Sequence, residues 1–204
     1  MQVILIRHGM TAGNAQGKYI GRTDEPLSSE GIAMVQQMGS DPAVPTVYVS
    51  PLRRTQQTAA ILFPNARQIV VDDLREMDFG DFENRNWAQM EHDEAYRAWV
   101  EGGCTAPCPN GEGRAEFSER VCNAFVGIVS AAAARGEEKV TFVVHGGTIM
   151  AVMERFAQPK GEFYSYGVKN GKGYRCQVSV AKDVCTLTEA ALWDGVKRCC
   201  ENPV

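Results

Sequence analysis

The sequence lacks several features that would place the protein in a specialised class. No apolar run reaches the roughly 20 residues that a membrane-spanning helix needs. The apolar residues 1–6 end at Arg7, too early for the apolar part of a signal peptide, so we expect no targeting segment. No excess charge indicates a nucleic-acid or membrane-surface partner, because 21 basic and 25 acidic residues give a net charge of −4.

The cysteines form no pattern typical of disulfides or of a metal site. Their number, seven, is odd, and no two are spaced as a C-x-x-C pair. Cys104 and Cys108 resemble half of a zinc site, but neither a second pair nor a nearby histidine completes it. We therefore expect free thiols in a reducing cytoplasm. The seven positions are Cys104, Cys108, Cys122, Cys176, Cys185, Cys199 and Cys200.

The pattern of apolar runs predicts an α/β fold. Four short runs have no polar alternation, which is typical of strands buried on both faces of a mostly parallel sheet. They span residues 2–6, 46–50, 68–71 and 140–144. Helical patterns alternate with them, at residues 28–38, 51–62, 87–100, 115–135 and 147–156. This alternation favours a three-layer α/β/α sandwich with a mostly parallel central sheet.

Three further stretches complete the expected organisation. Residues 173–193 are alternating and β-branched, so we expect two small edge strands near the C-terminus, around residues 181–184. Residues 20–27 and 102–113 lack periodicity and predict loops. Because no internal repeat or linker divides the 204 residues, a single domain over residues 1–204 is expected.

Two of the three histidines directly follow predicted buried strands. His8 stands between Arg7 and Gly9, and His145 precedes two glycines and a predicted helix. Ligands of open α/β sheets bind outside the carboxyl ends of the strands, and the start of a helix offers free N–H groups to an anion. Arg7 and His8 alone are as typical of the surface as of an active site, but the repeated arrangement favours an active site. His92 stands among acidic residues and is expected to be solvated.

A pair of arginines follows the second predicted strand. Arg53 and Arg54 lie in the expected first turn of a helix, where a positive charge opposes the helix dipole. A bound anion would explain this placement, because a guanidinium group matches phosphate oxygens bidentately. A solvated surface residue explains one of the two equally well.

Residues 74–83 combine carboxylates with aromatic side chains after a strand. A carboxyl group held near apolar rings binds its proton more tightly, which suits a general acid. Glu76, Asp78 and Glu83 are the candidates, and the pattern alone does not choose among them.

Taken together and in this order, these segments resemble the histidine phosphatase superfamily, also called the phosphoglycerate mutase-like family. Its hallmark is Arg-His-Gly at the end of the first strand, as at residues 7–9. The resemblance spans residues 4–152 and continues through Asn14 and through residues 21–24, 50–59, 74–80 and 145–147.

The resemblance implies a phosphoglycerate mutase-like fold and a role for each matching residue. His8 is implied to be the nucleophile that becomes phosphohistidine. Glu76 is implied to give the proton to the leaving oxygen, with Asp78 and Glu83 near enough to share that role. The phosphoryl pocket is implied to consist of Arg7, Arg54 and His145. Further contacts to the substrate or its phosphate are implied for Asn14, Gly21, Arg22 and Gly146.

The implied activity is that of a metal-independent phosphomonoesterase that needs no cofactor. The loop at residues 21–28 and the acidic segment look like the phosphatase branch of the family and are similar to α-ribazole phosphatases, although Asn84 stands where those enzymes usually have glycine. One alternative is mutase-type transfer of phosphate, which the missing pocket insertions disfavour. Another is a non-catalytic module that binds phosphorylated ligands, which the complete set of matching residues disfavours.

The expected partner is therefore a small-molecule phosphate ester, with α-ribazole phosphate as a candidate, and neither nucleic acid nor membrane. A cap-like excursion at about residues 82–114, with the loop around Arg22, is expected to cover the pocket and select the substrate. The protein is expected to be a monomer or a homodimer.

Overall fold

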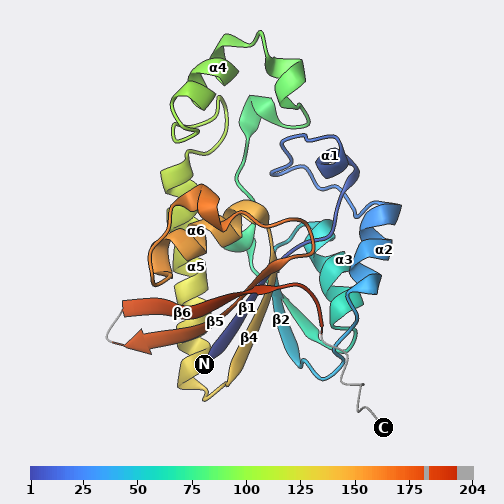
Figure 1. Cartoon of the computed structure of the whole chain (residues 1–204), viewed down its shortest axis with the longest axis vertical. Helices are drawn as coiled ribbons and strands as arrows, with labels where there is room; N and C mark the ends of the chain where they lie inside the picture. Colours follow the sequence, from blue (N-terminus) through green and yellow to red (C-terminus); the bar gives the residue numbers. More distant parts are fainter. Residues whose placement is uncertain (182–183, 197–204) are drawn as a thin grey trace.

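The computed structural model describes residues 1–181 and 184–196, which are built around a six-stranded sheet (Figure 1). The strands are β1 (Gln2–Arg7), β2 (Thr46–Val49), β3 (Arg67–Val70), β4 (Lys139–Val144), β5 (Gly173–Ala181) and β6 (Val184–Trp193). Their order across the sheet is β3-β2-β4-β1-β5-β6. The predicted Cys199 and Cys200 thiols lie outside the described residues.

The predicted sheet is confirmed. Each of the four strands predicted from apolar runs begins and ends within one residue of its predicted bounds. β3, β2, β4 and β1 are parallel to one another. The two strands expected near the C-terminus are β5 and β6, which pair in antiparallel fashion. Of these two, only β6 lies at the edge of the sheet, because β5 also pairs with β1. The sheet is thus mixed but mostly parallel.

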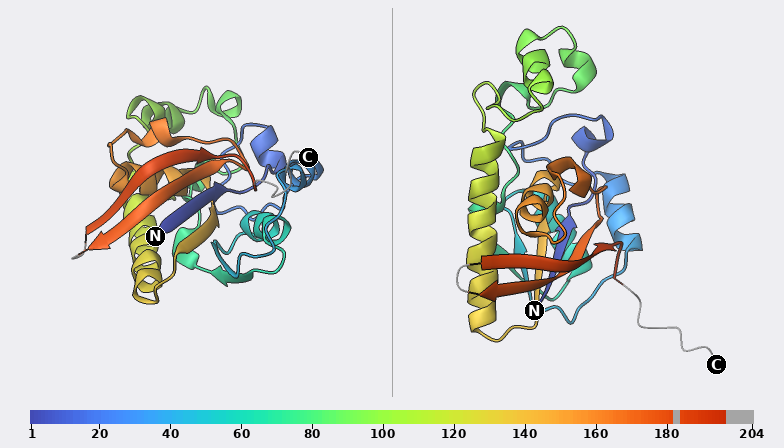
Figure 2. Two further views of the ribbon diagram at one scale, coloured as in Figure 1. Left: turned by 60° about the horizontal axis from the view of Figure 1, so that its bottom comes forward. Right: turned by 60° about the vertical axis from the view of Figure 1, so that its left-hand side comes forward.

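Helices cover both faces of the sheet, as the three-layer prediction required (Figure 2). They are α1 (Ala12–Ala15), α2 (Ser29–Gln37), α3 (Arg53–Leu62), α4 (Glu94–Glu101), α5 (Arg114–Ala134) and α6 (Gly146–Phe156). Successive side chains of a strand point to opposite faces. In β1, therefore, Val3 and Leu5 join the core under α5 and α6, whereas Ile4 and Ile6 join the core under α2 and α3. None of the helices in the described residues is both long and apolar enough to cross a membrane.

One predicted helix, over residues 87–100, is wrong in its continuity. The chain forms a short 3-10 helix, η3 (Trp87–Met90), then a turn, and then α4. The break follows from Asp93, whose side chain accepts a hydrogen bond from Tyr96 N at 3.3 Å and so caps the start of α4. His92 lies in the turn with 92% of its side chain exposed, which confirms its predicted place on the surface.

Residues 80–113 form a lobe beyond the carboxyl ends of the parallel strands, at the top of Figure 1. Aromatic rings hold the lobe together: the ring of Phe82 lies 5.4 Å from that of Tyr96 and 5.5 Å from that of Trp99. Trp99 also contacts Tyr19, with ring centroids 5.8 Å apart. The lobe is therefore attached to the loop that follows α1.

A buried ion pair closes the base of this lobe. Arg120 in α5 and Glu112 have only 13% and 14% of their side chains exposed, and two hydrogen bonds of 2.8 and 3.0 Å join them. Arg120 Nη1 also donates to the Asp73 carbonyl oxygen at 2.8 Å. Glu112 Oε2 accepts from Asp78 N at 2.9 Å. The pair thus holds both ends of the segment that carries Glu76.

Replacing Arg120 with alanine is expected to destabilise the protein by about 3–5 kcal/mol, because the buried Glu112 carboxylate loses its counter-charge. Arg135→Ala is the matched control, since Arg135 also pairs with a glutamate, Glu137, but keeps 52% of its side chain exposed. Exposed ion pairs contribute little to stability, so the control should unfold at nearly the wild-type denaturant concentration. Circular dichroism during denaturation measures both midpoints, and equal midpoints would contradict this role for Arg120.

Candidate active site

The two histidines predicted from strand ends lie side by side. β1 pairs with β4 in parallel, with Arg7 opposite Val144, and His8 N donates to the Val144 carbonyl oxygen at 2.9 Å. Both chains then leave the sheet at the same edge. The ring centroids of His8 and His145 are consequently 5.1 Å apart, edge to face, and both side chains are buried.

The His8 ring has a defined orientation and protonation state. Its Nδ1 lies 2.6 Å from the Gly9 carbonyl oxygen. Since a carbonyl oxygen can only accept, Nδ1 carries the proton and Nε2 keeps its lone pair in the neutral ring. Burial, and then the charges of Arg54 and Arg7, hold the pKa of His8 well below 6.5. His8 is therefore neutral near pH 7, with Nε2 free to act as a nucleophile.

His145 stands at the N-cap of α6 and contacts the end of β2. Its Nε2 lies 2.8 Å from Ser50 Oγ, and its buried Nδ1 has no hydrogen-bond partner within residues 1–181 and 184–196. Burial, and then the charges of Arg54 and of the neighbouring His8, lower the pKa of His145 well below 6.5. A Ser50 hydroxyl that donates to Nε2 leaves the proton on Nδ1, which makes that atom a donor.

Arg54, rather than Arg53, is the arginine at the site. Arg53 is exposed, whereas the Arg54 side chain is fully buried at the start of α3. Arg54 donates to the carbonyl oxygens of Thr23 and Gly21, each at 2.7 Å. Its Nε is buried and finds no partner in the part of the chain that the structure describes. Burial lowers the pKa of Arg54, and the charge of Glu76 opposes that shift most strongly.

Arg7 lies against the first turn of α6. Its Nη1 donates to the Val168 carbonyl oxygen at 2.7 Å, and a Cβ atom added to Gly146 would lie 3.4 Å from its guanidinium carbon. Its buried Nε, like that of Arg54, lacks a hydrogen-bond partner among the described residues. Burial lowers the pKa of Arg7, while the charge of Glu76 raises it. The guanidinium group of Arg7 therefore lies beside Gly146, at the N-terminus of α6.

Glu76 is held by two backbone N–H groups. Its Oε1 accepts from Met77 N and its Oε2 from Gly147 N, both at 3.0 Å. A Cβ atom at position 147 would lie 2.3 Å from Oε1, so glycine there lets the carboxyl approach the start of α6. Burial raises the pKa of Glu76, although both N–H groups and the charges of Arg54 and Arg7 act in the opposite direction.

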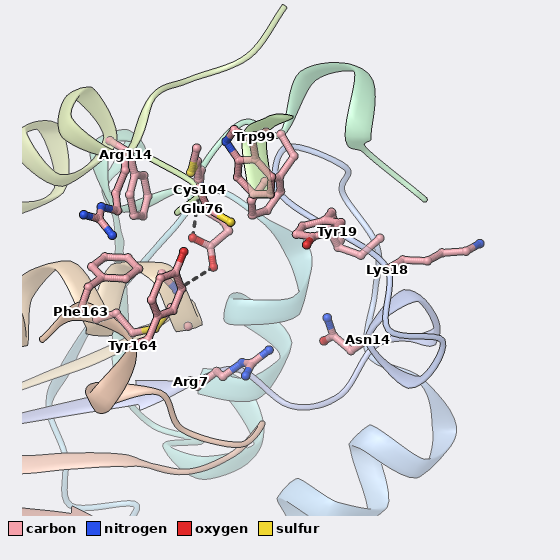
Figure 3. A pocket seen from close by; sticks show the side chains of 17 residues that line it. Arg7, Asn14, Lys18, Tyr19, Glu76, Trp99, Cys104, Arg114, Phe163 and Tyr164 are labelled. Carbon is pink, nitrogen blue, oxygen red and sulfur yellow. Dashed lines mark hydrogen bonds between the residues drawn. The ribbon is translucent and has the colours of Figure 1, made fainter. Parts of the chain in front are cut away.

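A cavity of about 350 Å³ is lined by Arg7 and Glu76 (Figure 3). His8, Arg54 and His145 are buried beside Arg7 and are not part of the cavity lining. The polar floor of the cavity comes from Arg7, Asn14, Glu76 and the first two glycines of α6. Aromatic and sulfur-containing side chains supply most of the walls, and Lys18 and Arg114 are its further cationic side chains. These aromatic and sulfur-containing side chains are Tyr19, Met77, Phe79, Trp99, Cys104, Phe117, Met150, Phe163 and Tyr164, and Ile20 also lines the cavity.

The structure brings most, but not all, of the predicted contact residues to this cavity. Asn14 lines it from α1, where its Oδ1 accepts from Asn170 Nδ2 at 3.0 Å. Gly146 also lines it. Gly21 and Arg22 do not: Gly21 binds Arg54 through its carbonyl oxygen, and Arg22 points to Asp78 with 63% of its side chain exposed.

The structure also distinguishes the three candidate acids from one another. Only Glu76 lines the cavity. Asp78 accepts from Gly80 N at 2.8 Å and pairs with Arg22. Glu83 accepts from the backbone of the loop after α1, away from the cavity lining.

The structure brings further residues to the site to which the sequence assigns no role. Thr58, one turn after Arg54, accepts from Gly9 N at 2.9 Å and so orients the turn after His8. Phe163 and Tyr164, from the short helix η4 (Phe163–Tyr166), form one wall of the cavity. Asn170 holds the His8 carbonyl oxygen at 3.2 Å. Among the described residues, no three His, Cys, Asp or Glu side chains gather as a metal site would require.

Comparison with known proteins gives a consistent set of relatives. A model of the histidine phosphatase superfamily (branch 1) matches residues 3–188. The adenosylcobalamin/alpha-ribazole phosphatase of Salmonella typhimurium is 28% identical over 208 residues, which cover 95% of this chain and 98% of that protein. The metal-independent phosphoserine phosphatase of Arabidopsis thaliana is 28% identical over 167 residues, which cover 77% of this chain and 69% of that protein.

A solved structure extends the likeness to three dimensions. The crystal structure of the alpha-ribazole phosphatase from Shigella flexneri matches with a TM-score of 0.77 and 28% identity, over 92% of this chain and 94% of that one. The residues matched by the family model include both strand-end histidines, Arg54 and Glu76. The resemblance seen in the sequence is thereby confirmed, and the chain belongs to the histidine phosphatase superfamily.

Proposed function

We propose that this phosphatase is a metal-independent phosphomonoesterase that forms a phosphohistidine at His8 and acts on a small phosphorylated metabolite. Family membership supports the class of reaction. The intermediate, the independence from metal and the substrate are the parts that we propose.

Three buried nitrogen atoms carry the proposal. Arg7 Nε, Arg54 Nε and His145 Nδ1 have no hydrogen-bond partner among the described residues, although they come from three separate segments around His8. Buried polar atoms are almost always paired, and an unpaired one is costly. A phosphoryl group offers several acceptor oxygens and negative charge, which is the chemistry that unpaired guanidinium and imidazole N–H donors bind. The N-terminus of α6 favours the same anion.

In the first step, His8 Nε2 forms a bond to phosphorus while the bond from phosphorus to the ester oxygen breaks. The proton of Glu76 passes to the departing oxygen, which leaves as an alcohol. In the second step, water attacks phosphorus and gives a proton to the Glu76 carboxylate as the bond to Nε2 breaks. Inorganic phosphate leaves, His8 is neutral again, and Glu76 has recovered its proton. The arginines stabilise the charge on the equatorial oxygens in both steps.

The cavity supports an ester whose alcohol part is planar and largely apolar. Its walls place Tyr19 and Trp99 on one side and Phe163 and Tyr164 on the other (Figure 3), and aromatic faces stack on planar groups. The candidate that we propose is α-ribazole phosphate, which carries an aromatic base and is named in relatives from Salmonella typhimurium and Shigella flexneri. Lys18 and Arg114 add positive charge to the cavity for a further polar group.

The nucleophile is tested by His8→Ala, with His92→Ala as the matched control because that third histidine is exposed. Hydrolysis of p-nitrophenyl phosphate in excess chelator should fall by at least about 10⁴-fold in His8→Ala, since no other group supplies the attacking lone pair. The control should keep full activity. When the wild type is mixed with a ³²P-labelled ester and quenched rapidly, it should carry a label that acid removes, as expected of phosphohistidine. Activity that survives the loss of His8 contradicts the mechanism, and activity abolished by chelator contradicts independence from metal.

The acid is tested by the pH dependence of kcat/KM in wild type and Glu76→Gln. Glu76 must be protonated, so activity on an alkyl phosphate should fall as pH rises through its raised pKa. On the acid side, activity should persist below pH 6.5, because the lowered pKa of His8 keeps the ring neutral until pH falls through it.

Glu76→Gln should slow the alkyl ester by about 100-fold or more and remove the wild-type alkaline fall, while p-nitrophenyl phosphate, whose leaving group needs little protonation, is slowed much less. Ionisation of the substrate is common to both enzymes and cancels in the comparison. Equal slowing of both esters would argue against an acid role.

The substrate is tested by release of inorganic phosphate from a metabolite panel that includes α-ribazole phosphate, phosphoserine, sugar bisphosphates and 3-phosphoglycerate. Phosphate esters of aromatic nucleosides should give the highest kcat/KM, because the aromatic walls bind their bases. Conversion of 3-phosphoglycerate to its 2-isomer without phosphate release would favour a mutase. Phosphate binding without turnover of any ester would favour a non-catalytic module.

A further inference from the structure

Glu83 gathers more hydrogen bonds than either of the other two candidate acids, yet it lies outside the cavity lining. Its Oε1 accepts from Gly21 N at 3.0 Å and from Arg22 N at 2.9 Å. Its Oε2 accepts from Thr23 Oγ1 at 2.7 Å, and Oε1 also accepts from Phe79 N at 3.3 Å. One half-buried carboxylate thus binds the N–H groups of a whole turn of backbone.

The opposite side of the same backbone turn binds Arg54. Gly21 and Thr23, whose N–H groups face Glu83, offer their carbonyl oxygens to Arg54 Nη2 and Nη1, each at 2.7 Å. The Ile20 carbonyl oxygen accepts from Nη2 at 3.3 Å. Residues 20–23 are therefore a bridge between the carboxylate of Glu83 and the guanidinium group of Arg54.

Two local features show how closely this bridge is fitted. A Cβ atom at Gly21 would lie 2.5 Å from Glu83 Oε1 and 1.9 Å from the Met77 carbonyl oxygen, so no other residue allows the same approach. Asn84 has φ 61°, a left-handed conformation that asparagine tolerates better than most residues. Its Nδ2 donates to Thr23 Oγ1 at 3.1 Å, which supports the hydroxyl that Thr23 gives to Glu83.

The bridge matters because the terminal nitrogens of Arg54 bind the loop, which leaves its Nε for another acceptor. The carbonyl oxygens of residues 20–23 bind both of its terminal nitrogens and so fix the plane of the guanidinium group. The direction of its unpaired Nε follows from that plane. A guanidinium group that is misplaced by about 1 Å loses much of its value in phosphoryl transfer.

We propose that Glu83 is a positioning residue that fixes the loop of residues 20–23 and, through it, the orientation in which Arg54 binds the phosphoryl group. This proposal rests on the proposed function only in naming that group. Glu83 is not the proton donor, because its carboxylate is bound to the loop and does not reach the cavity.

Calorimetric titration with inorganic phosphate tests the proposal without requiring turnover. Glu83→Gln replaces an acceptor oxygen by an NH₂ group that faces the loop N–H groups, and should weaken phosphate binding by at least about tenfold. Thr23→Val removes the hydroxyl, with its bonds to Glu83 and Asn84, but keeps the backbone bonds to Glu83, and should weaken phosphate binding by a smaller factor with the fold intact. Glu116→Gln, the same chemical change at an exposed carboxylate of α5, is the matched control and should bind phosphate as wild type does.

A double-mutant cycle shows whether Glu83 acts through Arg54. Arg54→Lys keeps the charge but removes the planar fork that the loop orients. In that background Glu83→Gln should change the phosphate Kd by less than about twofold, because residues that act through one another are not additive. Full additivity of the two changes would overturn the proposal, as would wild-type phosphate affinity in folded Glu83→Gln.

The leaving-group dependence separates positioning from proton donation. Glu83→Gln should lower kcat/KM for an alkyl phosphate and for p-nitrophenyl phosphate by the same factor, since both need Arg54 equally. A selective loss with the alkyl ester would make Glu83 an acid and overturn the proposal. If the wild type binds phosphate but hydrolyses neither ester, the proposed function fails while the titrations still decide the role of Glu83.

Discussion

The parallel pairing of β1 with β4 is the interaction on which the site depends. A backbone hydrogen bond from His8 N to Val144 O ends the shared ladder, and both chains turn out of the sheet directly after it. A one-residue slip in register would turn every side chain of β1 to the opposite face, and would exchange the cores that Leu5 and Ile6 now fill. The packing of two separate cores therefore fixes the distance between His8 and His145.

Once the strands are paired, the burial of His8, His145 and Glu76 shifts their pKa values, and the charges of Arg7 and Arg54 modify these shifts. The charges of Arg7 and Arg54 add to burial and lower the pKa of both histidines. Burial raises the pKa of Glu76, and the same two arginines limit how far it rises. Each shift favours the form that the proposed reaction needs, a neutral nucleophile and a protonated acid.

The sequence predicts best the parts of the site that depend on sheet topology. His8 and His145 follow buried strands, and the carboxyl ends of parallel strands meet at one edge whatever the loops do. The choice of Arg54 over Arg53 came from the family resemblance and agrees with burial. The loops are harder to predict from the sequence, because hydrogen bonds between side chains and backbone determine their conformation. Asp93, for example, caps a new helix and so interrupts the helix that the sequence predicts over residues 87–100.

Tertiary packing also decides which loop residues reach the cavity. Gly21 and Arg22 belong to the segment that resembles the family, but this loop turns its carbonyl oxygens to Arg54 instead of lining the cavity. Phe163 and Tyr164 stand in a single 3-10 turn without periodicity, so only tertiary packing brings them to the cavity. Asp78 N donates to the Glu112 carboxylate, and Glu112 N donates to the Asp78 carbonyl oxygen, each at 2.9 Å. Residues 85–111 lie within the segment that these bonds close, so a change in their sequence acts on the cavity wall, to which Trp99 and Cys104 belong. The backbone before Glu76 is held separately, because Arg120 binds the carbonyl oxygens of Asp73 and Arg75.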